Sequence, residues 1–256
     1  IEAVLIDLSG TLHVDDDPTP NAVEALKKLR TTNKKIKFVT NTTKESVSSL
    51  HKRLEKLGFD IQKEEIYSSL TAASNYVQEK QFNPFYIVTD DARKDFPANS
   101  TDRQHDSIVI GLAPDKFDYK NINDAFSILH KNNEAQLIAI HEGKFYKTKS
   151  GIAVGPGCFV KGLEYSTGVK SICIGKPNEY FFKSALPSGI SAENSCMIGD
   201  DPMDDIQGAR NIGMKGFLVE SGKYQPEQYK AKELPAADGI FKNFAEAVDF
   251  ILNTSS

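Results

Sequence analysis

Short apolar runs alternate with helix-patterned segments through the first third of the chain. The runs "AVLIDL" (3–8) and "IKFVTN" (36–41) each end at a turn, which is typical of strands buried on both faces of a parallel sheet. Apolar residues recur at helical spacing in "PNAVEALKKLRTTN" (20–33) and "SVSSLHKRLEKLGF" (46–59), and we expect a further helix over 64–81. This alternation predicts a doubly wound α/β fold.

The same order returns at the end of the chain, after a different pattern in the middle. A strand at "SCMIGDD" (195–201) precedes another helix-patterned segment, whereas the middle carries several strands in close succession. We therefore predict a parallel-sheet core built from residues 1–81 and 171–256, with a smaller α/β domain inserted over 82–170.

Composition excludes several classes of partner. The 256 residues carry 31 Lys and Arg against 35 Asp and Glu, a formal charge of −4, so no strong basic field would attract nucleic acid. No apolar run is long enough to span a membrane. The three cysteines lie far apart without C-x-x-C spacing, which favours reduced thiols and a cytoplasmic protein.

Polar residues stand where the expected core strands end. In an open α/β sheet the ligand site forms at the carboxyl ends of the strands, and these positions hold Asp7, Thr40 with Asn41, Lys176 and Asp200. Each has a structural alternative: a turn-capping Asp, a helix cap at 40–41, a solvated lysine, or acidic residues that begin a helix. Their recurrence at successive strand ends favours one shared site.

Phosphoryl transfer needs this set of groups. A carboxylate such as Asp7 can accept the phosphoryl group, and Mg²⁺ held by Asp7 and Asp200 would neutralise charge. Hydroxyl, amide and ammonium groups then hold the phosphate oxygens, which suits Thr40, Asn41 and Lys176.

The four segments together resemble a known family. "DLSGT", "VTN", "GKP" and "GDDPMDDIQGA" are similar to the four motifs of the haloacid dehalogenase (HAD) superfamily, and the long insert between the second and third motifs resembles the type C2 cap of its NagD-like members. The resemblance implies a Rossmann-like core with an inserted cap and a Mg²⁺-dependent phosphatase activity.

The resemblance also implies a role for each motif residue. Asp7 would be the nucleophile and a metal ligand, the main-chain carbonyl of Ser9 a second ligand, and Asp200 the third. Asp205 would hold metal-bound water. Phosphate would be bound by Thr40, Asn41 and Lys176, and Lys176 would also pair with the nucleophile.

Ser9 departs from the family pattern. Most phosphatases of the superfamily carry an aspartic acid there as general acid and base, and a serine hydroxyl cannot do this work because its pKa lies far from neutrality. Loss of such a group typically costs about 10²–10⁴-fold in rate. We therefore expect slow turnover and a preference for P–N, P–O–P or aryl phosphates, such as a phospho-amino acid, pyrophosphate or another small phosphorylated molecule.

Two alternatives remain open at this stage. The chain could be a non-catalytic or weakly active phosphate-binding or regulatory protein that lost its acid, or a phospho-accepting receiver domain, against which its length argues. Association into a homodimer through the cap is also left open.

Overall fold

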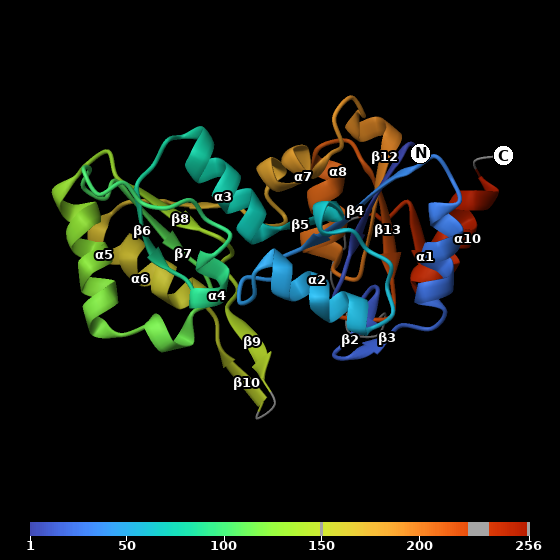
Figure 1. Cartoon of the computed structure of the whole chain (residues 1–256), viewed down its shortest axis with the longest axis horizontal. Coiled ribbons are helices and arrows are strands. Elements are labelled where there is room, and N and C mark those ends of the chain that lie inside the picture. The colour runs from blue at the N-terminus through green and yellow to red at the C-terminus, as the bar shows by residue number, and fades with distance from the viewer. Residues whose placement is uncertain (149–150, 225–235, 255–256) are drawn as a thin grey trace. The chain divides into compact units, whose positions relative to one another are not determined.

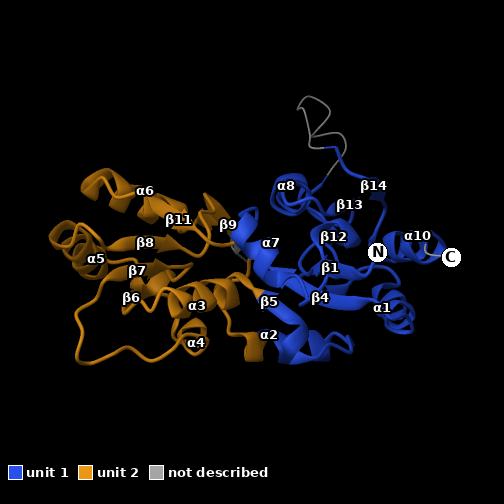
Figure 2. Ribbon diagram, turned by 90° about the horizontal axis from the view of Figure 1, so that it is seen from above, with its two compact units in different colours: residues 1–40, 50–67, 176–256 blue, residues 41–49, 68–175 orange. Residues whose placement is uncertain are grey.

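A computed structural model describes residues 1–148, 151–224 and 236–254, and these fall into two compact units. One unit comprises 1–40, 50–67 and 176–256, and the other comprises 41–49 and 68–175 (Figure 2). The second unit contains the whole span expected for the insert, together with a short segment after Thr40 and the residues flanking that span. Domain boundaries at 82 and 170 stay a prediction.

The first unit is built on a six-stranded sheet. In spatial order its strands are β14 (Gly239–Phe241), β13 (Lys215–Val219), β12 (Ser195–Gly199), β1 (Ala3–Asp7), β4 (Lys35–Thr40) and β5 (Ile66–Ser68). β1 is fully buried and pairs in parallel with both β4 and β12. This arrangement confirms the doubly wound α/β fold.

Helices cover both faces of this sheet. α1 and α10 pack against each other, blue against red in Figure 1, and α7 and α8 lie on the opposite side (Figure 2). The helical elements of this unit are α1 (Ala22–Arg30), α2 (Val47–Lys56, which begins in the other unit), η1 (Lys63–Glu65), α7 (Glu179–Ala185), η3 (Ala192–Asn194), η4 (Pro202–Gln207), α8 (Gly208–Asn211) and α10 (Phe244–Asn253). A short hairpin, β2 (His13–Val14) and β3 (Asp17–Pro18), follows β1.

The helix expected over 64–81 is wrong in its first part. Residues 66–68 form β5, the edge strand of the sheet, and the helix α3 (Ser69–Glu79) begins only afterwards. The Ser68 hydroxyl accepts a hydrogen bond from the amide of Thr71, and the Thr71 side chain accepts one from the Ser68 amide. This reciprocal cap sets the start of α3, and it leaves the β-favouring residues Ile66 and Tyr67 in the strand.

The second unit has its own four-stranded sheet and core. Its strands, in spatial order, are β11 (Ser171–Cys173), β8 (Gln136–Ala139), β7 (Ser107–Ile110) and β6 (Pro84–Ile87), all paired in parallel. The strands β9 (Phe145–Thr148) and β10 (Gly151–Val154) pair antiparallel in a separate two-stranded sheet. The helical elements are α3, α4 (Asp90–Arg93), η2 (Pro114–Lys116), α5 (Tyr119–Lys131) and α6 (Gly157–Thr167). α5 and α6 pack together and bury their apolar residues against β6, β7 and β8.

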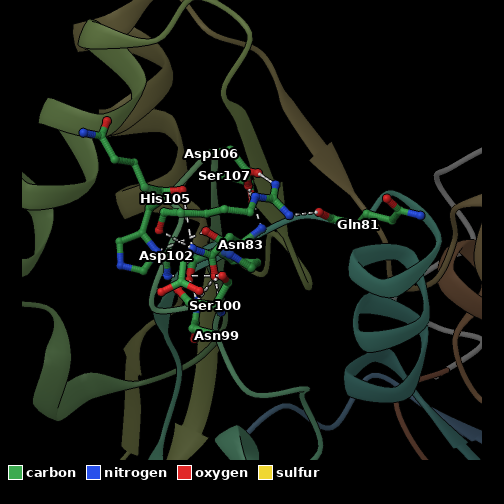
Figure 3. Close-up of polar contacts among 11 residues, drawn as sticks. Gln81, Asn83, Asn99, Ser100, Asp102, His105, Asp106 and Ser107 are labelled. Carbon is green, nitrogen blue, oxygen red and sulfur yellow. Dashed lines mark hydrogen bonds and ion pairs between the residues drawn. The ribbon is translucent and has the colours of Figure 1, made fainter.

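A polar network around Asn83 organises the long connection between α4 and β7 (Figure 3). The buried Asn83 side chain donates to the carbonyls of Arg103 (2.8 Å) and Ser100 (3.2 Å). Its Oδ1 accepts from the Asn99 side chain and the Ser100 amide, and its own amide donates to Asp106. One side chain therefore satisfies several backbone groups of a loop that has no regular structure.

No helix in the ranges that the structure describes is both long enough and apolar enough to cross a membrane.

Candidate active site

Three neighbouring strands of the large sheet deliver polar residues to one edge. β1 ends at Asp7, β4 ends at Thr40, and Asp200 directly follows β12. Since β1 lies between β4 and β12 and all three run in parallel, their carboxyl ends meet. The strand-end rule used on the sequence therefore locates this group correctly.

A buried lysine joins two of the carboxylates. Lys176 Nζ donates to Asp7 Oδ1 at 2.6 Å and to Asp205 Oδ1 at 2.6 Å, and all three side chains are almost fully buried. Burial alone would lower the pKa of Lys176, but the facing carboxylates of Asp205 and Asp7 outweigh it, so the pKa lies above its ordinary value. Lys176 is thus a permanent cation between two acids.

Asp200 completes a compact acidic cluster. One carboxylate oxygen from each of Asp7, Asp200 and Asp205 lies within 4.8 Å of the others. Burial, followed by repulsion from Asp7 and Asp205, raises the pKa of Asp200 to about 7. Burial also raises the pKa of Asp205, to about 6, in spite of the opposing attraction of Lys176.

The donor set of this cluster fits a hard divalent cation. All three side chains offer oxygen, and carboxylate oxygen is a preferred ligand of Mg²⁺. One lysine neutralises one of three carboxylates, so the fully ionised cluster keeps an excess of negative charge in a buried place. A bound divalent cation would balance that excess.

The acidic residues between Asp200 and Asp205 have different surroundings. Asp201 caps η4 by accepting hydrogen bonds from the amides of Met203 (2.9 Å) and Asp204 (3.0 Å). Its other oxygen lies 3.0 Å from Lys223 Nζ. The alternative of an acidic helix start therefore describes Asp201, while burial and repulsion by Asp201 raise the pKa of Asp204 to about 6.

Glycines allow the acids to approach the backbone closely. A Cβ on Gly199 would lie 2.3 Å from Asp205 Oδ2, and a Cβ on Gly10 would lie 2.2 Å from Asp200 Oδ2. Gly10 also has a φ of +92°, which L side chains rarely adopt. Neither the available space nor the backbone conformation therefore allows a residue with a side chain at Gly10.

The remaining expected residues lie in the following places. Thr40 is buried at the end of β4. Ser9 is exposed in the turn after β1, where it forms an isolated bridge with His13. Asn41 is the first residue of the second unit, and its Oδ1 lies 2.6 Å from where a Gly175 Cβ would stand. The individual roles of Ser9, Thr40 and Asn41 stay predictions.

Two contacts at this site have no counterpart in the sequence-based prediction. The Thr11 hydroxyl lies 3.5 Å from Asp7 Oδ2, and the amide of Lys223 donates to Asp200 Oδ2 at 2.6 Å. Lys223 follows the carboxyl end of β13, so extending the strand-end rule to that strand would have found it.

Comparison with known proteins gives relatives along nearly the whole chain. Residues 4–99 match the family model described as haloacid dehalogenase-like hydrolase, and residues 173–247 match a related hydrolase model. Haloacid dehalogenase-like hydrolase domain-containing protein 2 of Bos taurus is 49% identical over 253 residues, covering 98% of this chain and 96% of the relative.

Two further proteins are named as phosphatases. Human phospholysine phosphohistidine inorganic pyrophosphate phosphatase is 35% identical over 257 residues, covering 98% of this chain and 94% of its own length. The crystal structure of a 4-nitrophenylphosphatase from Thermotoga maritima superposes with a TM-score of 0.89 at 25% identity and covers 97% of each chain.

Proposed function

Because this chain belongs to the haloacid dehalogenase-like hydrolases, we propose that it is a Mg²⁺-dependent phosphatase in which the Asp7 carboxylate attacks phosphorus. The observation that carries the proposal is the buried cluster of Asp7, Asp200 and Asp205 at the carboxyl edge of the sheet, in which Lys176 pairs with Asp7 and Asp205. Names of phosphatases among the relatives agree with it.

The proposed reaction has two steps. A carboxylate oxygen of Asp7 bonds to phosphorus while the bond from phosphorus to the leaving group breaks, and the leaving group keeps a proton that it already carries or takes one from water. The oxygen of a water molecule then bonds to phosphorus while the bond from phosphorus to Asp7 breaks, and the proton of that water passes to solvent. This step releases inorganic phosphate and restores the carboxylate. Lys176 orients Asp7 through its 2.6 Å hydrogen bond and can also attract a phosphate oxygen.

The metal site would use Asp7, Asp200 and the Ser9 carbonyl, with Asp205 holding water nearby. A bound Mg²⁺ supplies positive charge that balances the phosphate and the carboxylates. The protein's part is to keep these oxygens together: Lys176 fixes Asp7 and Asp205, while the Asp201 amide donates to Asp205 Oδ2 at 3.1 Å.

Ser9 suggests the substrate class. With a hydroxyl in place of a carboxyl group, the leaving group must depart without a strong enzymic acid, which disfavours alkyl phosphates. A P–N bond whose nitrogen arrives protonated, pyrophosphate, or an aryl ester needs that acid less. The relative named for phospholysine, phosphohistidine and pyrophosphate supports this preference.

A substrate panel tests both the activity and the preference. Purified protein is assayed with and without Mg²⁺ on p-nitrophenyl phosphate, pyrophosphate, imidodiphosphate and a sugar phosphate. We expect Mg²⁺-dependent release of phosphate from the first three, and faster turnover of the sugar phosphate would contradict the assigned preference.

The Asp7→Asn variant distinguishes the proposed enzyme from a protein that only binds phosphate. The variant keeps the size of the side chain but removes the nucleophile, and we expect at least about 10⁴-fold less activity. Asp115→Asn, at an exposed position in η2, is the matched control and should retain full activity. Absence of any Mg²⁺-dependent activity in the wild type would favour the alternative of a regulatory phosphate-binding protein.

A further inference from the structure

The turn that follows β13 makes several contacts with the loops of the acidic cluster. Its residues Ser221, Gly222 and Lys223 come from "VESGKY" and lie within the same compact unit as Asp7 and Asp200. Neither the motifs nor the proposed chemistry assigns them a role.

Lys223 holds Asp200 through its backbone. Its amide donates to Asp200 Oδ2 at 2.6 Å, and the next amide, that of Tyr224, donates to the Asp200 carbonyl at 3.1 Å. A hydrogen bond to one carboxylate oxygen restricts the orientation of the group and leaves the other oxygen available for a cation.

Ser221 holds the opposite loop. Its hydroxyl donates to the carbonyl of Gly10 at 2.7 Å, next to Ser9 and three residues after Asp7. The turn therefore joins the loop that carries the nucleophile to the loop that carries Asp200.

Gly222 lies where no side chain fits. A Cβ there would stand 2.1 Å from Asp200 Oδ2 and 2.6 Å from the Gly10 Cα. Because Gly10 also leaves no room for a Cβ beside Asp200, the carboxylate is confined between two glycines from different turns. Such close packing restricts the position of the Asp200 carboxylate.

We propose that Ser221, Gly222 and Lys223 form a positioning turn. It holds the Asp200 carboxylate and, through the Gly10 carbonyl, the loop that carries the Ser9 carbonyl, at the distance that a divalent cation requires. The inference rests on the proposed function, because it assigns this turn to the metal site of that reaction. The turn touches no substrate and acts through Asp200 and the loop after β1.

Direct titration of metal-free protein with Mg²⁺ by calorimetry tests the positioning turn. We expect Gly222→Ala to weaken Mg²⁺ affinity about 10- to 100-fold, as for other groups that orient a metal ligand. Gly162→Ala is the matched control, since a Cβ at Gly162 in α6 meets nothing within 4 Å, and it should bind as the wild type does. Thermal unfolding in a chelator establishes that each variant is folded.

Ser221→Ala keeps the test decisive if Gly222→Ala does not fold. Loss of one hydrogen bond should weaken Mg²⁺ affinity about threefold to tenfold, and Ser221→Thr, which keeps the hydroxyl, should restore most of it. Unchanged affinity in a folded Gly222→Ala, or in Ser221→Ala where the first variant is unfolded, overturns the inference alone. Failure of the wild type to bind Mg²⁺ overturns the proposed function, and the inference with it.

Discussion

The Asn83 network and the Asp7 cluster are both buried and polar, but they are satisfied in different ways. Asn83 is neutral and meets mainly backbone amides and carbonyls at ordinary hydrogen-bond distances. The Asp7 cluster brings three carboxylates together with one ammonium that pairs with two of them, and the pKa values of Asp200 and Asp205 are raised. Hydrogen bonds that are all satisfied within the protein order a loop, as around Asn83. An excess of buried negative charge instead indicates a binding site for a cation.

A carboxyl group at position 9 should have the largest effect, and this effect is on the activity of the Asp7 cluster. Ser9→Asp should increase turnover of alkyl phosphates by up to about 10²–10⁴-fold, because a carboxyl group can protonate the leaving oxygen. Steady-state rates on a sugar phosphate and on p-nitrophenyl phosphate measure it. A gain confined to the aryl substrate would contradict the assigned role of Ser9.

Removal of the shared cation should destabilise the charged cluster strongly. Lys176→Met leaves the buried carboxylates of Asp7 and Asp205 without their shared cation, and we expect a loss of about 3–5 kcal/mol in unfolding free energy. Urea denaturation measures it. Lys183→Met, which removes an exposed pair with Glu179, is the control and should cost under about 1 kcal/mol. Equal losses in the two variants would show that burial of the pair is unimportant.

The charged cluster should also make stability depend on pH. The folded pKa values of Asp200 (about 7) and Asp205 (about 6) lie above the ordinary value of 3.8, so folding favours their protonated forms. Their contribution to the free energy of unfolding is therefore complete below pH 4 and is lost as pH rises towards 7.

Urea denaturation of metal-free protein between pH 4 and pH 8 measures this loss, with Asp200→Asn as the comparison. The variant cannot ionise at that position and should show a flatter profile. Steeper pH dependence in the variant would contradict the assignment.

Loss of the neutral network should have the smallest of these effects. Asn83→Ala leaves several loop carbonyls and amides without their partner, and we expect a loss of about 2 kcal/mol with kcat unchanged. Asn211→Ala, at an exposed position, is the control and should cost about 0.5 kcal/mol or less. A fall in kcat at temperatures where Asn83→Ala is folded would break the distinction between the two clusters.

The strand-end rule predicted much of this arrangement and left out what has no sequence pattern. Asp7 and Asp200 are found because buried apolar strands of the large sheet precede them. The strand before Lys176, β11, was expected in the same core sheet but belongs to the sheet of the second unit, so the strand-end rule does not account for Lys176. By contrast, the sequence around Asn83 predicts only a polar loop, because hydrogen bonds between residues distant in sequence give this loop its order.

Two further features that the sequence did not predict have local causes. Ile66 and Tyr67 continue an apolar pattern that is compatible with helix, and only the cap formed by Ser68 and Thr71 separates strand from helix. Gly222 carries no chemical group, so its close approach to Asp200 depends on the three-dimensional path of the chain.

The pairing of β1 with β12 has a consequence for how the protein is made. Ala3 of β1 pairs with Ser195 of β12, so β1 cannot pair with this neighbouring strand until most of the chain has left the ribosome. At about 5–20 residues per second this delay is roughly 10–40 seconds. The residues from 68 to 175 emerge as one continuous stretch and can fold in that interval, whereas Asp200 and Asp205 reach Asp7 among the last events of synthesis. A ribosome that stops early would therefore release a chain with an ordered middle part and no acidic cluster.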